Sequence, residues 1–257
     1  STVAEYQRGV PLMDVTAQRR YGALSAAQVA ALDEAAMDIG VDILQLMEVA
    51  GFQVARLAWR MLGSRPRRVH VVAGHGNNGG DALVAARQLC AWGCAVTVAV
   101  HVDPSHLAGV VDRQARAAEQ AGVAVVVSVE PDATVAPAGA ALVIDGLLGT
   151  GLSGAARPNH AAVVERMRGT ILSIDVPSGL SADAGVAAGT AVQATATCTL
   201  TACKRGFWIG ASRRWTGALY VADIGMPRQA WVRCGLVAPT LVRGGTLRRV
   251  PEPAAGG

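Results

Sequence analysis

The sequence predicts an α/β fold with a largely parallel sheet, helices on both faces of that sheet, and a helix pair in front of it. Hydrophobic residues make up 51% of the 257 residues and charged residues only 16%, so most of the chain should fold around a large core. From residue 69 onward, short apolar segments alternate with helical ones. This alternation is typical of buried parallel strands joined by helices.

The helix pair is predicted before residue 63, whereas residues 1–23 show no clear periodicity. Ser25 and Gln28 have the spacing of a capping box, so the first helix should run from about Ala26 to Met37. A second helix is expected from about Asp42 to Leu62, with apolar residues every three or four positions. The apolar face of the first helix consists of Val29, Leu32 and Ala36.

The alternating segments then follow in order. Strands are predicted at residues 69–73, 96–100, 123–127, 142–144, 171–174, 195–201 and 218–221. Helices are predicted at residues 81–91, 112–120 and 161–167. From residue 235 the chain is rich in Gly, Pro and Arg. We therefore expect one domain over residues 1–234 and a disordered tail over 235–257.

Composition disfavours several function classes. Basic and acidic residues number 23 and 19, and the arginine-rich stretches 65–68 and 243–249 lack the interleaved aromatic residues of a nucleic-acid platform. The five cysteines form no CxxC pair, so neither a disulfide scaffold nor a zinc site is expected. The sequence contains no apolar run long enough for a bilayer and no signal-peptide pattern at its start. We expect a cytoplasmic protein that binds neither nucleic acid nor membrane.

Four polar, glycine-rich segments each follow directly on a predicted strand, at residues 74–81, 145–154, 175–183 and 203–206. All strands of a parallel sheet end at the same edge, and ligands bind outside those carboxyl ends. The four segments should therefore converge on one cleft.

The first segment, Gly74 to Asp81, has the geometry of a phosphate cradle because it links a strand to a helix. Glycines let backbone N–H groups approach an anion, and the helix start adds a partial positive charge. The alternative is a tight turn. A turn needs only one or two such residues, and this segment has six Gly or Asn residues, so ligand binding is favoured.

Oxygen-bearing side chains mark the second and third segments. Asp145 and Asp175 each stand at the end of an apolar strand, where a carboxylate is costly unless it is paired or solvated. They could cap the following loops, but two on one sheet edge favour a site. With Asn78 and Ser178 they offer only oxygen ligands, which suit a hard cation better than a transition metal.

Lys204 is the only lysine among the 23 basic residues, and it too ends a predicted strand at this edge. In a chain that uses Arg elsewhere, a retained Lys suggests a need for a compact ammonium with an adjustable pKa. Its position favours a functional role, either as an acid/base or as a phosphate contact.

Several ordered motifs resemble the YjeF N-terminal domain family, the NAD(P)H-hydrate epimerases. The residues that carry the resemblance are GHGNNGGDALVAARQL from residue 74, VIDGLLGTGLSG from residue 143, ILSIDVPSGLSAD from residue 171, and the Lys204 segment. LMEVAG at residues 46–51 and VADIGMP at residues 221–227 also resemble the family. The resemblance covers about residues 20–228.

The resemblance implies a three-layer αβα, Rossmann-like fold and a homodimer. Family members interconvert the R and S epimers of hydrated NADH and NADPH (NAD(P)HX), which carry a hydroxyl at C6 of the nicotinamide ring. A separate S-specific dehydratase then repairs the S form. NAD(P)HX is thus the expected substrate, and no organic cofactor is expected.

The resemblance also implies site residues. Asp145, Asp175 and Lys204 are the candidates for the acid/base, because loss and return of the hydroxyl, or ring opening and reclosure, both need proton transfer. One potassium ion per subunit would be held by Asn78, Asp145 and Ser178. Substrate would contact Asn77, Asn78, Gly79, Gly80, Asp81, Gly149, Thr150, Gly151, Leu152, Ser153, Gly154, Ala155 and Asp175.

The sequence departs from the family pattern in three places. Ala82 stands where Gly is common, Arg205 and Gly206 replace a common Pro-Gly, and residues 211–216 carry Arg213, Arg214 and Trp215. These departures leave open a relative recruited to another small molecule, or a non-catalytic binding module. Retention of the polar site residues favours an enzyme. The stretch after Pro227 is too short for the dehydratase domain of many relatives, so we expect no dehydratase activity.

Overall fold

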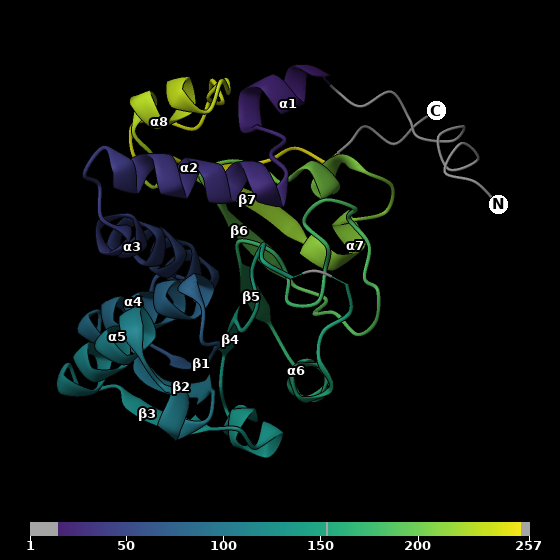
Figure 1. Cartoon of the computed structure of the whole chain (residues 1–257). Helices are drawn as coiled ribbons and strands as arrows, with labels where there is room; N and C mark the ends of the chain where they lie inside the picture. Colours follow the sequence, from purple (N-terminus) through teal and green to yellow (C-terminus); the bar gives the residue numbers. More distant parts are fainter. Residues whose placement is uncertain (1–14, 153, 253–257) are drawn as a thin grey trace.

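The computed structural model describes residues 15–152 and 154–252 and contains an eight-stranded sheet with the order β3-β2-β1-β4-β5-β6-β7-β8 (Figure 1). All neighbouring strands are parallel except β7 and β8. The strands are β1 (Arg68–Ala73), β2 (Ala95–His101), β3 (Ala124–Ser128), β4 (Leu142–Gly146), β5 (Ile171–Ile174), β6 (Ala196–Leu200), β7 (Ala218–Ala222) and β8 (Leu247–Arg249).

Helices cover both faces of this sheet, as the sequence predicts. In Figure 1, α3, α4 and α5 lie on one side of the sheet, and α6 and α7 lie on the other. The α-helices are α1 (Val15–Tyr21), α2 (Ala26–Asp38), α3 (Ile43–Met61), α4 (Asn77–Ala91), α5 (Gly109–Gln120), α6 (Pro158–Val164), α7 (Arg213–Thr216) and α8 (Arg228–Arg233). Short 3₁₀ helices span Pro104–His106, Pro131–Thr134 and Arg205–Trp208.

Capping boxes begin both helices of the N-terminal pair. At α2, the Gln28 backbone N–H donates to Ser25 Oγ at 3.2 Å, and the Ser25 N–H donates to Gln28 Oε1 at 2.9 Å. Asp42 and Gln45 form the same motif at α3. Such caps satisfy N–H groups that a helix leaves without an internal partner. They fix where the pair starts, and so how it lies beside the sheet edge.

α3 and α4 pack unusually close together. A Cβ at Gly51 of α3 would collide with the side chain of Val84 on α4. Glycine at this crossing lets the two helix backbones approach, and this approach places α3 over the start of α4. The N-terminal pair therefore forms a wall beside the glycine-rich segment.

Two boundaries near that segment differ from the prediction. α4 begins at Asn77, four residues before the predicted start at Asp81, so half of the glycine-rich segment is helical. β4 continues to Gly146, so Asp145 lies inside a strand. Helix propensity argues against Asn and Gly in a first turn, but packing of the segment against the sheet overrides it.

The prediction of a disordered tail from residue 235 disagrees with the structure as far as Glu252. β8 pairs antiparallel with β7, and the Val250 N–H donates to the Leu219 carbonyl at 2.8 Å. Val242 and Val250 are buried in a cluster with Phe207. These two valines lie in a stretch of the sequence that is rich in Gly, Pro and Arg, so no periodic pattern predicts their burial. Residues 253–257 lie outside the described part of the chain.

All five cysteines are free thiols. Among the residues that the structure describes, no helix combines the length and the apolar character needed to cross a membrane.

The ordered tail can be tested with Val250→Ala. Val250 is 1% exposed, so its truncation should lower the free energy of unfolding by about 2 kcal/mol. Val237→Ala is the matched control, because Val237 in the same tail is 90% exposed and should change stability by less than about 0.5 kcal/mol. Chemical denaturation of both variants measures the difference. Equal stabilities would contradict the packing of the tail.

Candidate functional site

A cavity of about 660 Å³ opens over the carboxyl ends of the central strands, within the usual size range of small-molecule sites. Segments distant in sequence meet here, as predicted. The helix pair, the start of α4 and the loops after β1, β4, β5 and β6 all contribute to its lining. The cavity lies at the boundary between β1 and β4. From this boundary the chain adds β2 and β3 on one side of the sheet and β5 and β6 on the other, and ligands usually bind at such a point.

The start of α4 forms one wall of the cavity. Gly76 is the N-cap, and no side chain caps this helix. Asn77 and Asn78 of the first turn line the cavity. A Cβ at Gly79 would collide with the Gly74 carbonyl, so only glycine allows the tight turn from strand to helix. An uncapped start of a 15-residue helix offers N–H groups and a partial positive charge to an anion.

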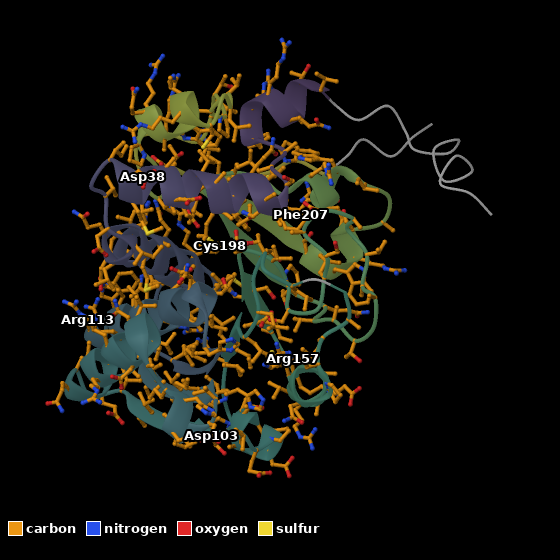
Figure 2. The ribbon with its side chains drawn as sticks, in the orientation of Figure 1. Asp38, Asp103, Arg113, Arg157, Cys198 and Phe207 are labelled. Carbon is orange, nitrogen blue, oxygen red and sulfur yellow. The ribbon has the colours of Figure 1, made fainter. Side chains whose placement is uncertain are left out.

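Asp175 occupies the opposite part of the lining in a rare backbone conformation. Its φ is +62°, and Thr201, which also lines the cavity, has φ +66°. The Asp175 N–H donates to the carbonyl of Cys198, labelled in Figure 2, at 2.8 Å. Its carboxylate accepts from the Leu200 N–H at 3.0 Å. Such left-handed non-glycine residues persist where surrounding contacts hold them, and they cluster at functional sites.

Lys204 lies beneath Asp175 and has no contact with the cavity. It is 0% exposed, and its Nζ lies 2.5 Å from Asp175 Oδ1. The ammonium also donates to Thr199 Oγ1 and to the carbonyls of Leu200 and Ala202, each at 3.0 Å. A direct contact between Lys204 and a phosphate disagrees with this burial.

Two more carboxyl groups line the cavity near this ion pair. Asp81 on α4 is 7% exposed, and burial, followed by the charges of Asp175 and Asp33, holds its pKa well above the usual range. Burial and then Asp175 raise the pKa of Asp33 on α2 to about 6, against the opposing effect of Lys204. One wall thus combines a carboxylate paired with Lys204 and carboxyl groups whose pKa is raised. Such pairs supply an acid and a base in one site.

Asp145 lies deeper and does not line the cavity. It is 0% exposed, and its carboxylate accepts from Ser173 Oγ at 2.7 Å, Ser178 Oγ at 2.6 Å and the Ser178 N–H at 2.9 Å. Burial raises its pKa, and these hydrogen bonds oppose the rise. A catalytic contact between Asp145 and substrate therefore disagrees with the structure.

The three residues predicted to hold a cation converge around Leu148. Asn78 Nδ2 donates to the Leu148 carbonyl at 2.8 Å, and the Leu148 N–H donates to Ser178 Oγ at 2.9 Å. Ser178 in turn contacts Asp145. Asp145 forms no ion pair with any described side chain, so its buried charge lacks a cationic neighbour. This donor set contains only oxygen ligands for a metal, which fits a hard cation.

The described residues offer no comparable set of ligands to a metal that is bound by His, Cys, Asp or Glu. No group of three or more His, Cys, Asp or Glu residues in the described ranges has the geometry to hold a metal ion.

The predicted substrate-binding residues separate into three groups. Gly79, Gly80 and Gly154 do not line the cavity, and Ser153 lies outside the described residues. The residues that do line it are Asn77, Asn78, Asp81, Gly149, Thr150, Gly151, Leu152, Ala155 and Asp175.

Sequence reasoning missed several lining residues. Asp33 lies four residues after Val29, so it interrupts the apolar face of its helix, and that interruption was the available signal. His75, Arg157 and His160 also line the cavity. His75 follows β1, whereas Arg157 and His160 lie at the start of α6, and no motif in the sequence links the two segments.

The departures from the family pattern lie outside the cavity. Ala82, Arg205 and residues 211–216 are absent from its lining. Arg205 is 3.9 Å from Asp183, and Arg213 donates to the Pro251 carbonyl at 3.0 Å.

Comparison with known proteins agrees with this architecture. A family model described as "YjeF-related protein N-terminus" matches residues 43–206. The bifunctional NAD(P)H-hydrate repair enzyme Nnr of Hyperthermus butylicus is 42% identical over 221 residues, which cover 83% of this chain and 40% of the relative. The NAD(P)H-hydrate epimerase of Dehalogenimonas lykanthroporepellens is 36% identical over 207 residues, which cover 79% of this chain and 81% of the relative.

A solved structure shares the fold. The crystal structure of yeast YNL200c matches with a TM-score of 0.73 at 24% identity, over 88% of this chain and 99% of the yeast chain. The relatives differ in length, and the chain spans about 40% of the bifunctional Nnr proteins that it matches.

The buried ion pair can be tested with Lys204→Met. Removal of the ammonium leaves the Asp175 carboxylate buried without a partner, so the free energy of unfolding should fall by about 3 kcal/mol or more. Arg205→Met removes a neighbouring exposed charge and should cost less than about 1 kcal/mol. Urea denaturation at pH 7 compares the two. A Lys204→Met protein as stable as the control would show that the pair is unimportant.

Asp33→Asn should make the protein more stable at neutral pH. The folded protein raises the pKa of Asp33 from 3.8 to about 6, so it binds this proton more tightly than the unfolded chain does. The associated stability is present below about pH 4 and is lost as the pH rises through 6. The variant should therefore match the wild type at pH 4 and exceed it by about 1 to 2 kcal/mol at pH 7.5.

Asp38→Asn on the same helix is the control for this substitution, because Asp38 is exposed at the helix end (Figure 2). Denaturation at several pH values measures both variants. A gain that is the same at pH 4 and pH 7.5 would contradict the placement of Asp33 in the acidic wall.

Proposed function

The chain belongs to the YjeF-related N-terminal family, and we propose that it is an isomerase that interconverts the R and S epimers of NAD(P)HX for coenzyme repair. The observation that carries this proposal is the acidic wall. Asp81, whose pKa is raised by burial, and Asp175, which is paired with Lys204, lie in one cavity that also contains the uncapped start of α4. The cavity thus offers both an anion site for a pyrophosphate and an acid–base pair for a ring.

The pyrophosphate of the substrate would lie at the start of α4. Asn77 and Asn78 bring their backbone N–H groups to the cavity there. Gly149, Thr150 and Gly151 form the adjoining loop and leave room for the sugar and phosphate groups. The hydrated nicotinamide ring would then extend toward Asp81 and Asp175.

Asp81 and Asp175 can carry the proton transfers of either route. In hydroxyl loss, Asp81 gives its proton to the C6 oxygen, water leaves, and the ring becomes a cation beside the Asp175 carboxylate. Water then adds to the other face and returns a proton to Asp81.

In ring opening, Asp175 accepts the hydroxyl proton, the bond from C6 to the ring nitrogen breaks, and Asp81 protonates that nitrogen. Reclosure on the other face reverses these transfers.

Lys204 is a positioning residue in this proposal. Its ammonium pairs with the Asp175 carboxylate and fixes the direction of that carboxylate from below. Asp33, on the opposing helix, adds negative charge that favours a cationic ring. Lys204 and Asp33 therefore influence the carboxyl groups of the cavity from opposite sides.

Potassium would be held by Asn78, Asp145 and Ser178. The ion would supply the positive charge that buried Asp145 lacks, and it would fix the loop from Leu147 onward. We also propose a homodimer. Val49 and Phe52 on the outer side of α3 are exposed apolar residues that such an interface could cover.

An epimerisation assay tests the proposed function. R-NADPHX is mixed with an S-specific dehydratase and its nucleotide, potassium is present, and the return of NADPH absorbance is followed. This protein should accelerate the return above the uncatalysed rate. Asp81→Asn and Asp175→Asn should each lower the acceleration by about 10²-fold or more, because each removes one proton-transfer group. Replacement of potassium with lithium should lower it as well.

Asp132→Asn is the control, because this carboxylate is exposed on the far 3₁₀ helix. It should retain full acceleration. Folded protein in potassium that gives no acceleration would refute the epimerase proposal and would direct attention to another ligand for the cavity.

A further inference from the structure

A second cavity, of about 410 Å³, adjoins the first beyond the end of β2. We call it the histidine pocket, because His75, His101 and His160 line it together with Arg157. His75, Arg157 and His160 line both cavities, so the two are continuous. Figure 2 labels Arg157 near α6. None of the proposed catalytic groups lies in the histidine pocket.

The three imidazole rings come from separate elements and contact one another. His75 follows β1, His101 ends β2, and His160 lies on α6. The rings of His75 and His160 stack with centroids 6.3 Å apart, and those of His101 and His160 meet edge to face at 5.6 Å. Three elements thus direct ring nitrogens toward one space.

His101 has an unmet hydrogen-bonding atom. The residue is only 5% exposed, and its Nδ1 is buried with no partner among the described residues. Buried polar atoms are nearly always paired, so an orphaned ring nitrogen at a cavity wall indicates a missing ligand atom. The backbone of Ser128 lies beside the ring and interacts with it.

The charge of the histidine pocket favours an anion. Its lining contains no carboxylate, and Arg157 forms no ion pair with any side chain in the described ranges. The groups that face His160 are His75, His101 and Arg157, and with burial they lower its pKa. Burial also lowers the pKa of His101. The rings of His101 and His160 therefore favour the neutral form when the pocket is empty, and a dianion would draw protons onto them.

The position of the pocket indicates which anion would reach it. In the sheet, β2 lies on one side of β1, whereas β4 and β5 lie on the other. A dinucleotide centred on the start of α4, with its nicotinamide ring near Asp175, extends its adenosine ribose toward the end of β2. In doubly wound sheets, an acidic residue there binds a free ribose 2′-hydroxyl, and a cationic one accommodates a 2′-phosphate. Here the end of β2 carries His101.

We propose that the histidine pocket binds a phosphate monoester and, resting on the proposed function, that this is the 2′-phosphate of NADPHX. His101 and His160 donate to the phosphate oxygens, and Arg157 supplies permanent positive charge. The chain then acts on the phosphorylated coenzyme in preference to NADHX. This specificity is separate from the acid–base chemistry at the other end of the groove.

Calorimetric titration with adenosine 2′,5′-bisphosphate and adenosine 5′-monophosphate tests the pocket without any turnover. At pH 6 the bisphosphate should bind at least about tenfold more tightly, because the added contacts are charge-assisted. This advantage should shrink by pH 8, since the rings must take up protons to bind the dianion. NMR of the histidine rings should show their pKa values rising when the bisphosphate binds.

His101→Gln and Arg157→Gln should each reduce the advantage of the bisphosphate. Arg157 is exposed, so its substitution leaves the core intact even if His101→Gln disturbs folding. His106→Gln, at an exposed position a few residues after β2, is the matched control and should leave the advantage unchanged. Equal binding of the two nucleotides, or an advantage that survives both substitutions, would overturn the proposal.

The ratio of kcat/KM for NADPHX and NADHX separates this proposal from the proposed function. The wild-type ratio should exceed one and should fall in Arg157→Gln, through KM rather than kcat. Epimerisation of both hydrates with equal efficiency, and no preference for the bisphosphate, would refute the histidine pocket and leave the epimerase proposal intact. A preference for the bisphosphate with neither hydrate epimerised would support the histidine pocket and refute the epimerase proposal.

Discussion

The buried ion pair between Lys204 and Asp175 is the interaction on which the site depends. The ammonium is fully enclosed and saturates its donors with two carbonyls, one hydroxyl and the carboxylate. It holds a carboxylate in a left-handed backbone position at the cavity surface. Two further carboxyl groups lie near the pair, and burial, followed by the charge of Asp175, raises the pKa of both Asp81 and Asp33. Burial and the position of the Asp175 carboxylate thus set the acidity of the wall together.

The parallel sheet places these groups in one groove that is long enough for an extended ligand. Strand ends from both sides of β1 meet at one edge, so an acidic wall, a helix start and a basic pocket lie in succession along one groove. The close crossing of α3 and α4 holds the N-terminal helix pair against this edge, and that contact brings Asp33 into the wall. Polarity therefore changes along the groove from acidic to basic, which matches a ligand with a cationic intermediate at one end and phosphates beyond it.

The positions of the strands and of the glycine-rich segments were predictable from the sequence, because continuous apolar strands and glycine-rich ends are local signals. Asp175 and the Asn77–Asp81 turn were found in this way, and Asp175 and three residues of the turn line the cavity. Lys204 was placed at the right edge, but its burial depends on how residues 200–204 turn beneath Asp175, which no pattern records. Asp145 was predicted as an acid/base candidate at a strand end, but β4 extends two residues beyond its predicted end and encloses this side chain. His101 and His160 meet only through the tertiary fold.

The excess of carboxyl groups in the acidic wall has a consequence for inhibition. A wall that stabilises a transient cationic ring also suits a ring whose positive charge is permanent. The nicotinamide of an oxidised coenzyme has that charge, and its pyrophosphate matches the start of α4. Under the proposed hydroxyl-loss route, oxidised coenzymes would compete for the groove, because they would resemble the intermediate more closely than the substrate does. The same feature identifies a planar cationic heterocycle joined to a diphosphate as the starting scaffold for a tight inhibitor.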